Sequence, residues 1–399
     1  MLRGAVRLGS VTVESQRGVS LRVWRGDDLT AGMPDARLWE SPVVTPGHRA
    51  TELVPSWNAV TPPGTRIQVE ARATLDDGSD TGWLVLARWS SDNGGEGATQ
   101  ESQDPQGPDA PRAPRTSVSG QESESWAVET DTLVARDGRL ITEWQVRVHL
   151  HGTGPEGYPP RLTLVAGVAS DESPDTADSP EGGIPTSVPT GIPARTLAVP
   201  TLSQMRHRGH YPQWDGGGSS WCSPTSLAMV LRYWGTGPAP ADTAWVQAHD
   251  DPQDTVVDAV AREVFDPAYG GAGNWAFNTA YAARFGLEAY VTRLRSLREA
   301  EQFIAAGIPV IASVSFEEDA LPGAGYDTQG HLLVIVGFTG DGDVVVNDPA
   351  SHLLPDNDQV RTTYSRKPFE RAWLRPTGTV YVLHPPDVPL PAPPAQANW

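Results

Sequence analysis

The stretch GGGSSWCSPTSLAMVLRYWG, residues 216–235, decides how the C-terminal half of this chain folds. A glycine-rich segment ends at Cys222, the only cysteine in the 399 residues. Ser223 suits the N-cap of a helix and Pro224 its first helical position, apolar residues follow at helical spacing, and Gly235 is a typical stop. The thiol is therefore predicted at the N-terminal end of a buried helix, where unpaired N–H groups favour the reactive thiolate.

A lone cysteine is more often a small buried hydrophobic residue than a nucleophile. A nucleophilic role for Cys222 therefore requires a base and a group that orients the base. Residues 329–338 read as a buried strand opening with His331, and 339–343 as a hairpin turn. The return strand leads into Asp348, so the hairpin brings imidazole and carboxylate to the same end of a sheet. Taken separately, His331 is also explained as a surface residue and Asp348 as a turn former before proline. With the thiol they make a candidate Cys–His–Asp arrangement.

Residues 199–383 resemble the papain-like cysteine peptidases of the bacteriocin-leader-processing group, in its stand-alone bacterial branch. The matching pieces occur in the family order: VPTLSQ at 199–204, WCSPTS at 221–226, GIPV at 307–310, GHL at 330–332 and NDP at 347–349. The resemblance implies that Cys222 is the nucleophile and His331 the base. It also implies that Asp348 orients the base and that Gln204 donates a hydrogen bond to the oxyanion.

Two features depart from the family pattern. In better-known members the glutamine lies only a few residues before the cysteine, whereas here eighteen positions separate Gln204 from Cys222. Gln213 is nearer in sequence and is the rival donor, but it lies in a Tyr/Pro/Trp/Gly loop. The second departure is Ser223, which stands where glycine often follows the cysteine. This change is mild because serine caps helices well.

The composition makes nucleic acid an unexpected partner. The formal net charge is −19 and Lys367 is the only lysine, whereas nucleic-acid binding depends on basic residues that neutralise phosphates. A single cysteine rules out an internal disulfide and leaves the redox compartment open. The chain shows no signal peptide and no apolar run long enough for a membrane span. We therefore expect a cytoplasmic protein, although another export route stays open.

Residues 1–170 carry a different pattern, the alternation typical of half-buried strands. Apolar and polar residues alternate over 67–75, 144–150 and 162–168, and turn-forming residues separate these runs. This predicts an all-β sandwich ahead of the cysteine-containing domain. Residues 91–125 are rich in Gly, Pro, Gln and Asp and are expected to form a long surface excursion.

Five tryptophans of the predicted sandwich allow two interpretations: Trp57, Trp83, Trp89, Trp126 and Trp144. One is a face that binds a carbohydrate or a protein ligand, since aromatic rings serve such surfaces. The other, which we favour, is that the tryptophans fill the core of a small sandwich, where large aromatic side chains contribute most of the buried area.

The second domain is predicted to span residues 197–387 and to have the α+β division of papain-like proteins, with helices before an antiparallel sheet. Helices are expected over 254–265 and 274–285, and a third helix is expected to start at a capping box, Ser296 to Glu299. A strand is expected over 309–316. This division places the nucleophile on a helix and the base on a strand, facing each other.

The remaining segments lack apolar periodicity. Residues 171–196 are acidic and then rich in Pro, Ser and Thr, so they read as the interdomain linker, and the proline-rich tail 388–399 is expected to be disordered. Four carboxylates raise the question of a cation site: Asp242, Asp250, Asp251 and Asp254. Their spacing fits no calcium loop, so we predict no metal and no cofactor.

Together these features predict a cysteine peptidase that hydrolyses a peptide or protein substrate through an acyl-enzyme. Two alternatives stay open. The same triad could transfer the acyl group to an amine instead of water, or the domain could be a non-catalytic module that kept the fold and binds peptides.

Overall fold

The computed structural model describes residues 17–31, 37–91, 115–172, 186–246 and 254–399. Its N-terminal part holds two antiparallel five-stranded sheets. The first sheet has the order β1 (Val19–Arg25), β10 (Arg161–Ser170), β3 (Glu52–Val60), β8 (Thr132–Ala135) and β7 (Trp126–Glu129). The second has the order β2 (Leu38–Glu40), β9 (Ile141–His151), β4 (Arg66–Leu75), β5 (Leu84–Trp89) and β6 (Thr116–Ser117). A short helix, α1 (Asp27–Ala31), follows β1.

Tryptophans from the two sheets meet in a shared core. The Trp24 ring on β1 lies 5.4 Å from that of Trp39 on β2 and 5.9 Å from that of Trp144 on β9, both edge to face. Trp57 and Trp89 are also at most 1% exposed. The idea that the five tryptophans form a ligand-binding face is therefore wrong for Trp57, Trp89 and Trp144, which are core residues. Only Trp83 and Trp126 are partly exposed.

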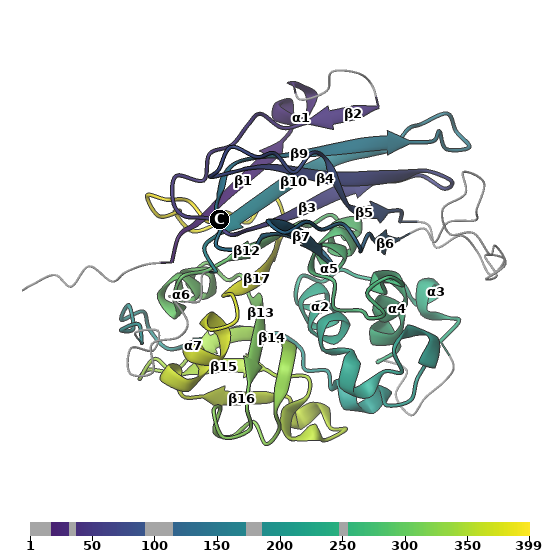
Figure 1. Ribbon diagram of the computed structural model, residues 1–399. Coiled ribbons are helices and arrows are strands. Elements are labelled where there is room, and N and C mark those ends of the chain that lie inside the picture. Colours follow the sequence, from purple (N-terminus) through teal and green to yellow (C-terminus); the bar gives the residue numbers. More distant parts are fainter. Residues whose placement is uncertain (1–16, 32–36, 92–114, 173–185, 247–253) are drawn as a thin grey trace, which may run out of the picture.

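The C-terminal part is built on a seven-stranded antiparallel sheet. Its main path is β12 (Glu288–Arg293), β17 (Thr379–His384), β13 (Val310–Phe316), β14 (Thr328–Phe338), β15 (Val344–Asn347) and β16 (Arg361–Tyr364), and β11 (Arg195–Thr196) pairs with β14. Helices before the sheet lie on one side in Figure 1: α2 (Cys222–Tyr233), α3 (Pro240–Thr243), α4 (Thr255–Val264) and α5 (Trp275–Ala282). Two later helices lie on the other side: α6 (Leu297–Ala305) and α7 (Arg366–Leu374).

The expected helices over 254–265, 274–285 and from Ser296 onward, and the strand over 309–316, are confirmed as α4, α5, α6 and β13. The capping box at Ser296 is wrong. Ser296 is the N-cap residue, but among the described residues its side chain makes no capping hydrogen bond. Glu299 turns back instead to the Arg295 backbone N–H at 2.8 Å and to the Arg295 guanidinium at 3.0 Å. The carboxylate thus neutralises a buried cation rather than capping the helix.

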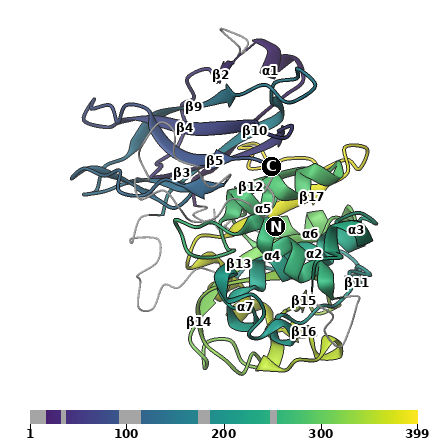
Figure 2. The same ribbon diagram turned by 90° about the vertical axis from the view of Figure 1, so that its right-hand side faces the viewer.

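The two parts share a close interface (Figures 1 and 2), because β3 packs against α5 and β12. The Asn58 amide donates to the Ala289 carbonyl at 2.7 Å and accepts from its N–H at 3.1 Å. Arg293, which is 1% exposed, pairs with Glu52 at 2.6 Å and Glu172 at 2.9 Å. Side-chain-to-backbone hydrogen bonds and buried charge therefore join the N-terminal sheets to the C-terminal sheet.

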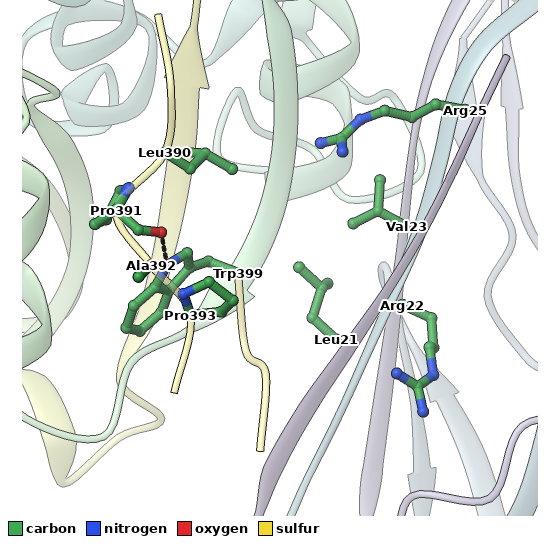
Figure 3. A pocket seen from close by; sticks show the side chains of 9 residues that line it. All are labelled: Leu21, Arg22, Val23, Arg25, Leu390, Pro391, Ala392, Pro393 and Trp399. Carbon is green, nitrogen blue, oxygen red and sulfur yellow. Dashed lines mark hydrogen bonds between the residues drawn. The ribbon is translucent and has the colours of Figure 1, made fainter. Parts of the chain in front are cut away.

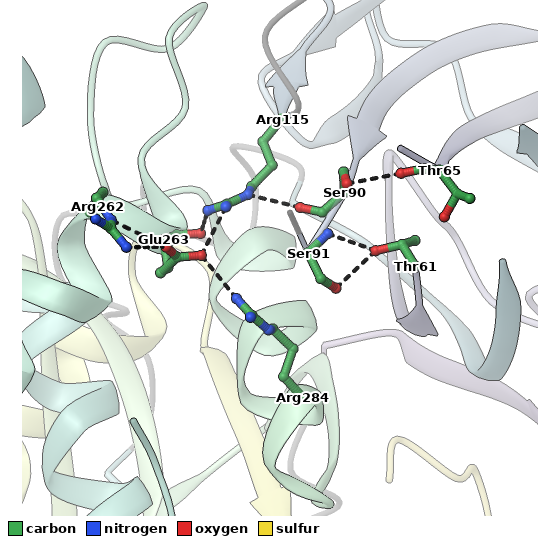
Figure 4. A network of polar contacts seen from close by, with 8 residues as sticks. All are labelled: Thr61, Thr65, Ser90, Ser91, Arg115, Arg262, Glu263 and Arg284. Carbon is green, nitrogen blue, oxygen red and sulfur yellow. Dashed lines mark hydrogen bonds and ion pairs between the residues drawn. The ribbon is translucent and has the colours of Figure 1, made fainter. Parts of the chain in front are cut away.

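A second polar network joins the two parts at Arg115 (Figure 4). The Arg115 guanidinium donates to the Ser90 carbonyl at 2.9 Å and to the Glu263 carboxylate at 2.9 Å, and Arg284 also reaches Glu263 at 2.9 Å. Burial lowers the pKa of Arg115 to about 10. Of the surface excursion predicted over 91–125, residues 92–114 lie outside the described residues. Arg115 is buried against the C-terminal part, and Thr116–Ser117 form β6.

The linker and the tail differ from the sequence expectation where they are described. In the predicted linker, residues 173–185 lie outside the described residues, but the Ser187 N–H donates to Glu370 at 2.7 Å and β11 joins the sheet. The prediction of a disordered tail over 388–399 is wrong. Asn398 is fully buried and its amide donates to the Arg293 carbonyl at 2.8 Å, while the Trp399 ring packs 5.2 Å from Phe303. A pocket of about 410 Å³ lies between β1 and this tail (Figure 3).

Candidate active site

Cys222 is the first residue of α2, and it is 8% exposed. Trp221 occupies the N-cap position, so the helix begins two residues earlier than predicted and Ser223 is not its N-cap. The Ser223 hydroxyl contacts the Tyr381 hydroxyl at 3.0 Å instead. The predicted stop is confirmed, since Gly235 has φ +67° and donates to the Arg232 carbonyl at 3.0 Å. The thiol thus sits on the first turn, among unpaired backbone N–H groups.

The segment before Cys222 depends on glycine. Gly217 and Gly218 have φ of +62° and +52°, and a Cβ on either would collide with the backbone of His207 or Arg208. Only glycine adopts such a conformation at so close an approach without strain. The glycine-rich run therefore lets the chain pass close to His207 and Arg208 before α2 begins at Cys222.

Gln204 opens that 3₁₀ helix, η2 (Gln204–His207), and is 1% exposed. Its side-chain amide donates to the Gly218 carbonyl at 2.7 Å, four residues before the cysteine. The second N–H of the amide remains for another acceptor. Gln213 lies on η3 (Pro212–Trp214) and is exposed. The eighteen-residue separation therefore does not take Gln204 away from the segment that enters Cys222.

His331 and Asp348 meet as the hairpin predicts. His331 lies on β14, Asp348 follows β15 directly, and the His331 Nε2 lies 2.9 Å from the Asp348 Oδ1. The residues are 4% and 0% exposed. The register, which sequence alone did not define, pairs Val334 with Asn347. Because Nε2 faces the carboxylate, Nδ1 is the ring nitrogen left for the thiol.

The thiol and the imidazole are electrostatically coupled. Burial by itself would raise the pKa of Cys222, but hydrogen bonding and charge from His331 outweigh it and leave this pKa lowered. Burial likewise disfavours the imidazolium, yet the charge and hydrogen bond of Asp348 raise the pKa of His331 to about 10. The pair therefore favours thiolate and imidazolium at neutral pH. The Ser226 hydroxyl, bonded to the Leu332 carbonyl at 3.0 Å, helps hold α2 against β14 beside this pair.

The carboxylate of Asp348 accepts four hydrogen bonds. Besides His331, the Ala350 N–H donates to Oδ1 at 3.0 Å. The hydroxyls of Tyr326 and Tyr364 donate to Oδ2 at 2.8 and 2.7 Å. Burial would raise the pKa of Asp348, but the His331 charge and these donors leave it lowered. Sequence reasoning missed both tyrosines because neither belongs to a motif. Tyr364 reaches the site only because β16 pairs beside β15.

Comparison with known proteins identifies both parts of the chain. Residues 27–170 match the family described as Peptidase C39 N-terminal domain, and residues 196–381 match the Peptidase_C39 like family. All four predicted site residues, Gln204, Cys222, His331 and Asp348, fall in the second match. The resemblance seen in the sequence is thereby confirmed at the level of the family.

Solved structures and curated proteins add less. A crystal structure titled as a C39-like peptidase from Bacillus anthracis is 16% identical, with 47% of this chain and 96% of that chain covered. Its TM-score is 0.28, which is too low to support a conclusion about the fold. No curated protein matches this chain. Within the described residues, none of the helices has the length and apolar character required to span a bilayer.

Proposed function

We propose that this chain, whose residues 196–381 belong to the Peptidase_C39 like family, is a cysteine peptidase that cleaves peptide or protein substrates. One observation carries the proposal. A buried acid–base pair, His331 with Asp348 at 2.9 Å, is coupled to the only thiol in the chain. A structural cysteine needs no such partner, whereas a nucleophilic one needs a base that is itself oriented.

The reaction proceeds by thiolate attack in this proposal. The Cys222 Sγ bonds to the substrate carbonyl carbon, and the His331 imidazolium gives its proton to the leaving amine as the acyl-enzyme forms. Neutral His331 then takes a proton from water, whose oxygen attacks the acyl carbon. The bond from Cys222 Sγ to that carbon breaks, which releases the carboxylic acid product and restores the thiolate and the imidazolium. Asp348 stays ionised and holds the imidazole in one tautomer throughout.

The oxyanion of each tetrahedral intermediate requires two donors. The backbone N–H of Cys222 supplies one, and we propose the free amide N–H of Gln204 as the other. The Gln204 amide is fixed by its bond to the Gly218 carbonyl, and a donor held in place before the reaction stabilises developing charge best. Gln213 is exposed and has no comparable support.

The finer architecture is part of the same proposal. The helices before an antiparallel sheet in residues 196–381 support a papain-like fold, and the tryptophan contacts between the two N-terminal sheets support a β-sandwich. We keep the division near 1–170 and 197–387, with the linker and tail packed where they are described. A cytoplasmic location stays a prediction.

A peptide-library assay tests the function. We expect the full chain to release fragments, Cys222→Ala to release none, and the exposed-site control Gln213→Ala to keep full activity. Added amine acceptors separate hydrolysis from acyl transfer, because transfer would give amide products in place of free carboxylates. Equal products from the full chain and Cys222→Ala would refute catalysis by this thiol. Saturable peptide binding without turnover would instead identify a non-catalytic module.

A further inference from the structure

Two histidines and an aspartate converge outside the catalytic pair. His207 ends η2, His210 follows three residues later, and Asp258 lies on α4. The Nδ1 atoms of His207 and His210 lie 3.0 and 2.8 Å from different oxygens of the Asp258 carboxylate. One ligand atom from each residue lies within 4.8 Å of the other two. Within the described part of the chain this is the one group of three or more such residues with that geometry.

The cluster is buried and needs a positive charge. The His207 and Asp258 side chains are 3% and 1% exposed, and that of His210 is 12% exposed. No arginine or lysine in the described ranges forms an ion pair with Asp258, whereas its neighbour Asp254 pairs with Arg206. A buried carboxylate is costly unless a cation compensates it. Either an imidazolium or a metal ion must do so here.

We propose that His207, His210 and Asp258 bind one divalent transition-metal ion of the zinc class. Neutral imidazole and carboxylate form a donor set suited to zinc, whereas magnesium and calcium prefer oxygen ligands alone. Zinc binds such ligands at about 2.0–2.2 Å, which places two tetrahedral ligand atoms about 3.3–3.6 Å apart. The two nitrogen–oxygen contacts, at 3.0 and 2.8 Å, would therefore lengthen by a few tenths of an ångström, and any wider pair within the 4.8 Å cluster would close. His210 is the most exposed of the three side chains, at 12%, so we expect the ion to enter on that side and water to complete its coordination.

The position of the site gives it a structural consequence. His207 and His210 lie in the segment between Gln204 and Cys222, which is longer than the family pattern, and Asp258 lies on a helix packed against α2. A bound ion would therefore fasten this segment to α4. The buried His207 Nε2, which has no partner among the described residues, stays unpaired whether Nδ1 binds metal or hydrogen-bonds. It does not favour either state.

Metal titration of the full chain tests the site independently of catalysis. The Cys222→Ser background removes the thiol, which with His331 would otherwise bind the same ions. After chelator treatment, we expect this protein to take up one Zn²⁺ per chain and to give the visible absorption of four-coordinate Co²⁺. Zinc should also raise the Tm. In the same background, Asp258→Asn and His210→Gln should each lose the Co²⁺ signal and weaken Zn²⁺ binding at least tenfold.

The matched control is His149→Ala in the N-terminal part. His149 stacks on His151 and lies 3.6 Å from Glu70, so it also combines two histidine rings with a carboxylate, but these residues do not form a metal-ligand cluster among the described residues. This variant should bind as tightly as the background. Binding of less than one ion per chain, or binding unchanged in both cluster variants with their folds intact, would overturn the proposal. The cluster would then be a hydrogen-bonded fastening of the same segment.

Discussion

Two buried polar networks in this molecule use similar groups for different ends. At Asp348 four donors converge on one carboxylate, which in turn charges the imidazole facing the thiol. At Arg293 one guanidinium is shared by Glu52 and Glu172, and Arg17 also pairs with Glu172 at 3.0 Å, so two cations face two carboxylates. The first network leaves a reactive pair with shifted pKa values, and the second joins two sheets. A buried charged network therefore indicates catalysis only where it shifts the pKa of a nucleophile.

The largest expected effect is the loss of peptide turnover when the network at Asp348 is broken. His331→Ala removes both the proton carrier and the cation that keeps Cys222 as thiolate, so turnover should fall by about ten-thousandfold or more. The protein should stay folded at the assay temperature, as its Tm would show. Single-turnover cleavage of a peptide found in the library assay would measure this. Activity within tenfold of the parent chain would show that the pair is structural, and His331→Gln checks that a cavity is not the cause.

The converse substitution should act on stability. Arg293→Met removes the cation shared by Glu52 and Glu172 and leaves Glu172 with Arg17 alone. Removing one partner of such a network costs about 3–5 kcal/mol. Denaturant unfolding at pH 8 measures this loss, because burial raises the pKa of Glu172 to about 7 and the carboxylate is ionised above that pH. Turnover per folded molecule should be unchanged.

Arg136→Met is the matched control, since Arg136 pairs with Glu122 and Glu129 at 39% exposure. Exposed pairs contribute about 0–1 kcal/mol, so this variant should unfold almost like the parent chain. Equal destabilisation by both substitutions would remove the distinction between a network that joins the two parts and ordinary surface pairs.

The hairpin that brings His331 to Asp348 could be predicted because its partners are local. Seventeen residues separate His331 from Asp348, and a short turn fixes which strand ends meet. The interface could not be predicted, because Asn58 and Ala289 are 231 residues apart and their pairing depends on how whole sheets pack. The start of α2 was missed by two residues for a similar reason. Ser223 would cap the helix in isolation, but Tyr381, on a distant strand, takes its hydroxyl.

Gln204→Ala tests whether the catalytic network extends to the 3₁₀ helix. Loss of one oxyanion donor lowers turnover by about a hundred- to a thousandfold, and the fold should remain because Gln204 contributes one side-chain bond to a backbone carbonyl. Gln213→Ala should change turnover less than about twofold, since the residue is exposed. Single-turnover rates decide the ranking. If Gln213→Ala were the more harmful, the oxyanion role would pass to that residue.

The pH dependence of alkylation measures the charge of the pair directly. The pKa of Cys222 is lowered and that of His331 is raised to about 10, so thiolate and imidazolium coexist between those values. Iodoacetamide should therefore react at a pH well below the ordinary thiol value of about 8.5. The rate should change again near pH 10, where the imidazolium loses its proton. A single titration at the ordinary thiol pKa, or a need for denaturant, would contradict the ion pair.

The smallest expected effect comes from the two tyrosines. Tyr326→Phe or Tyr364→Phe removes one hydroxyl donor from the Asp348 Oδ2 while the ring keeps filling its space. The carboxylate, less stabilised, then attracts the His331 imidazolium more strongly and raises its pKa. The alkaline limb of the pH–rate profile should consequently move upward, by less than about one pH unit per variant. Tyr381→Phe is the control, because its hydroxyl contacts Ser223 and not Asp348. No shift, or an equal shift in the control, would mean that the tyrosines only pack around the site, and a downward shift would contradict the electrostatic argument.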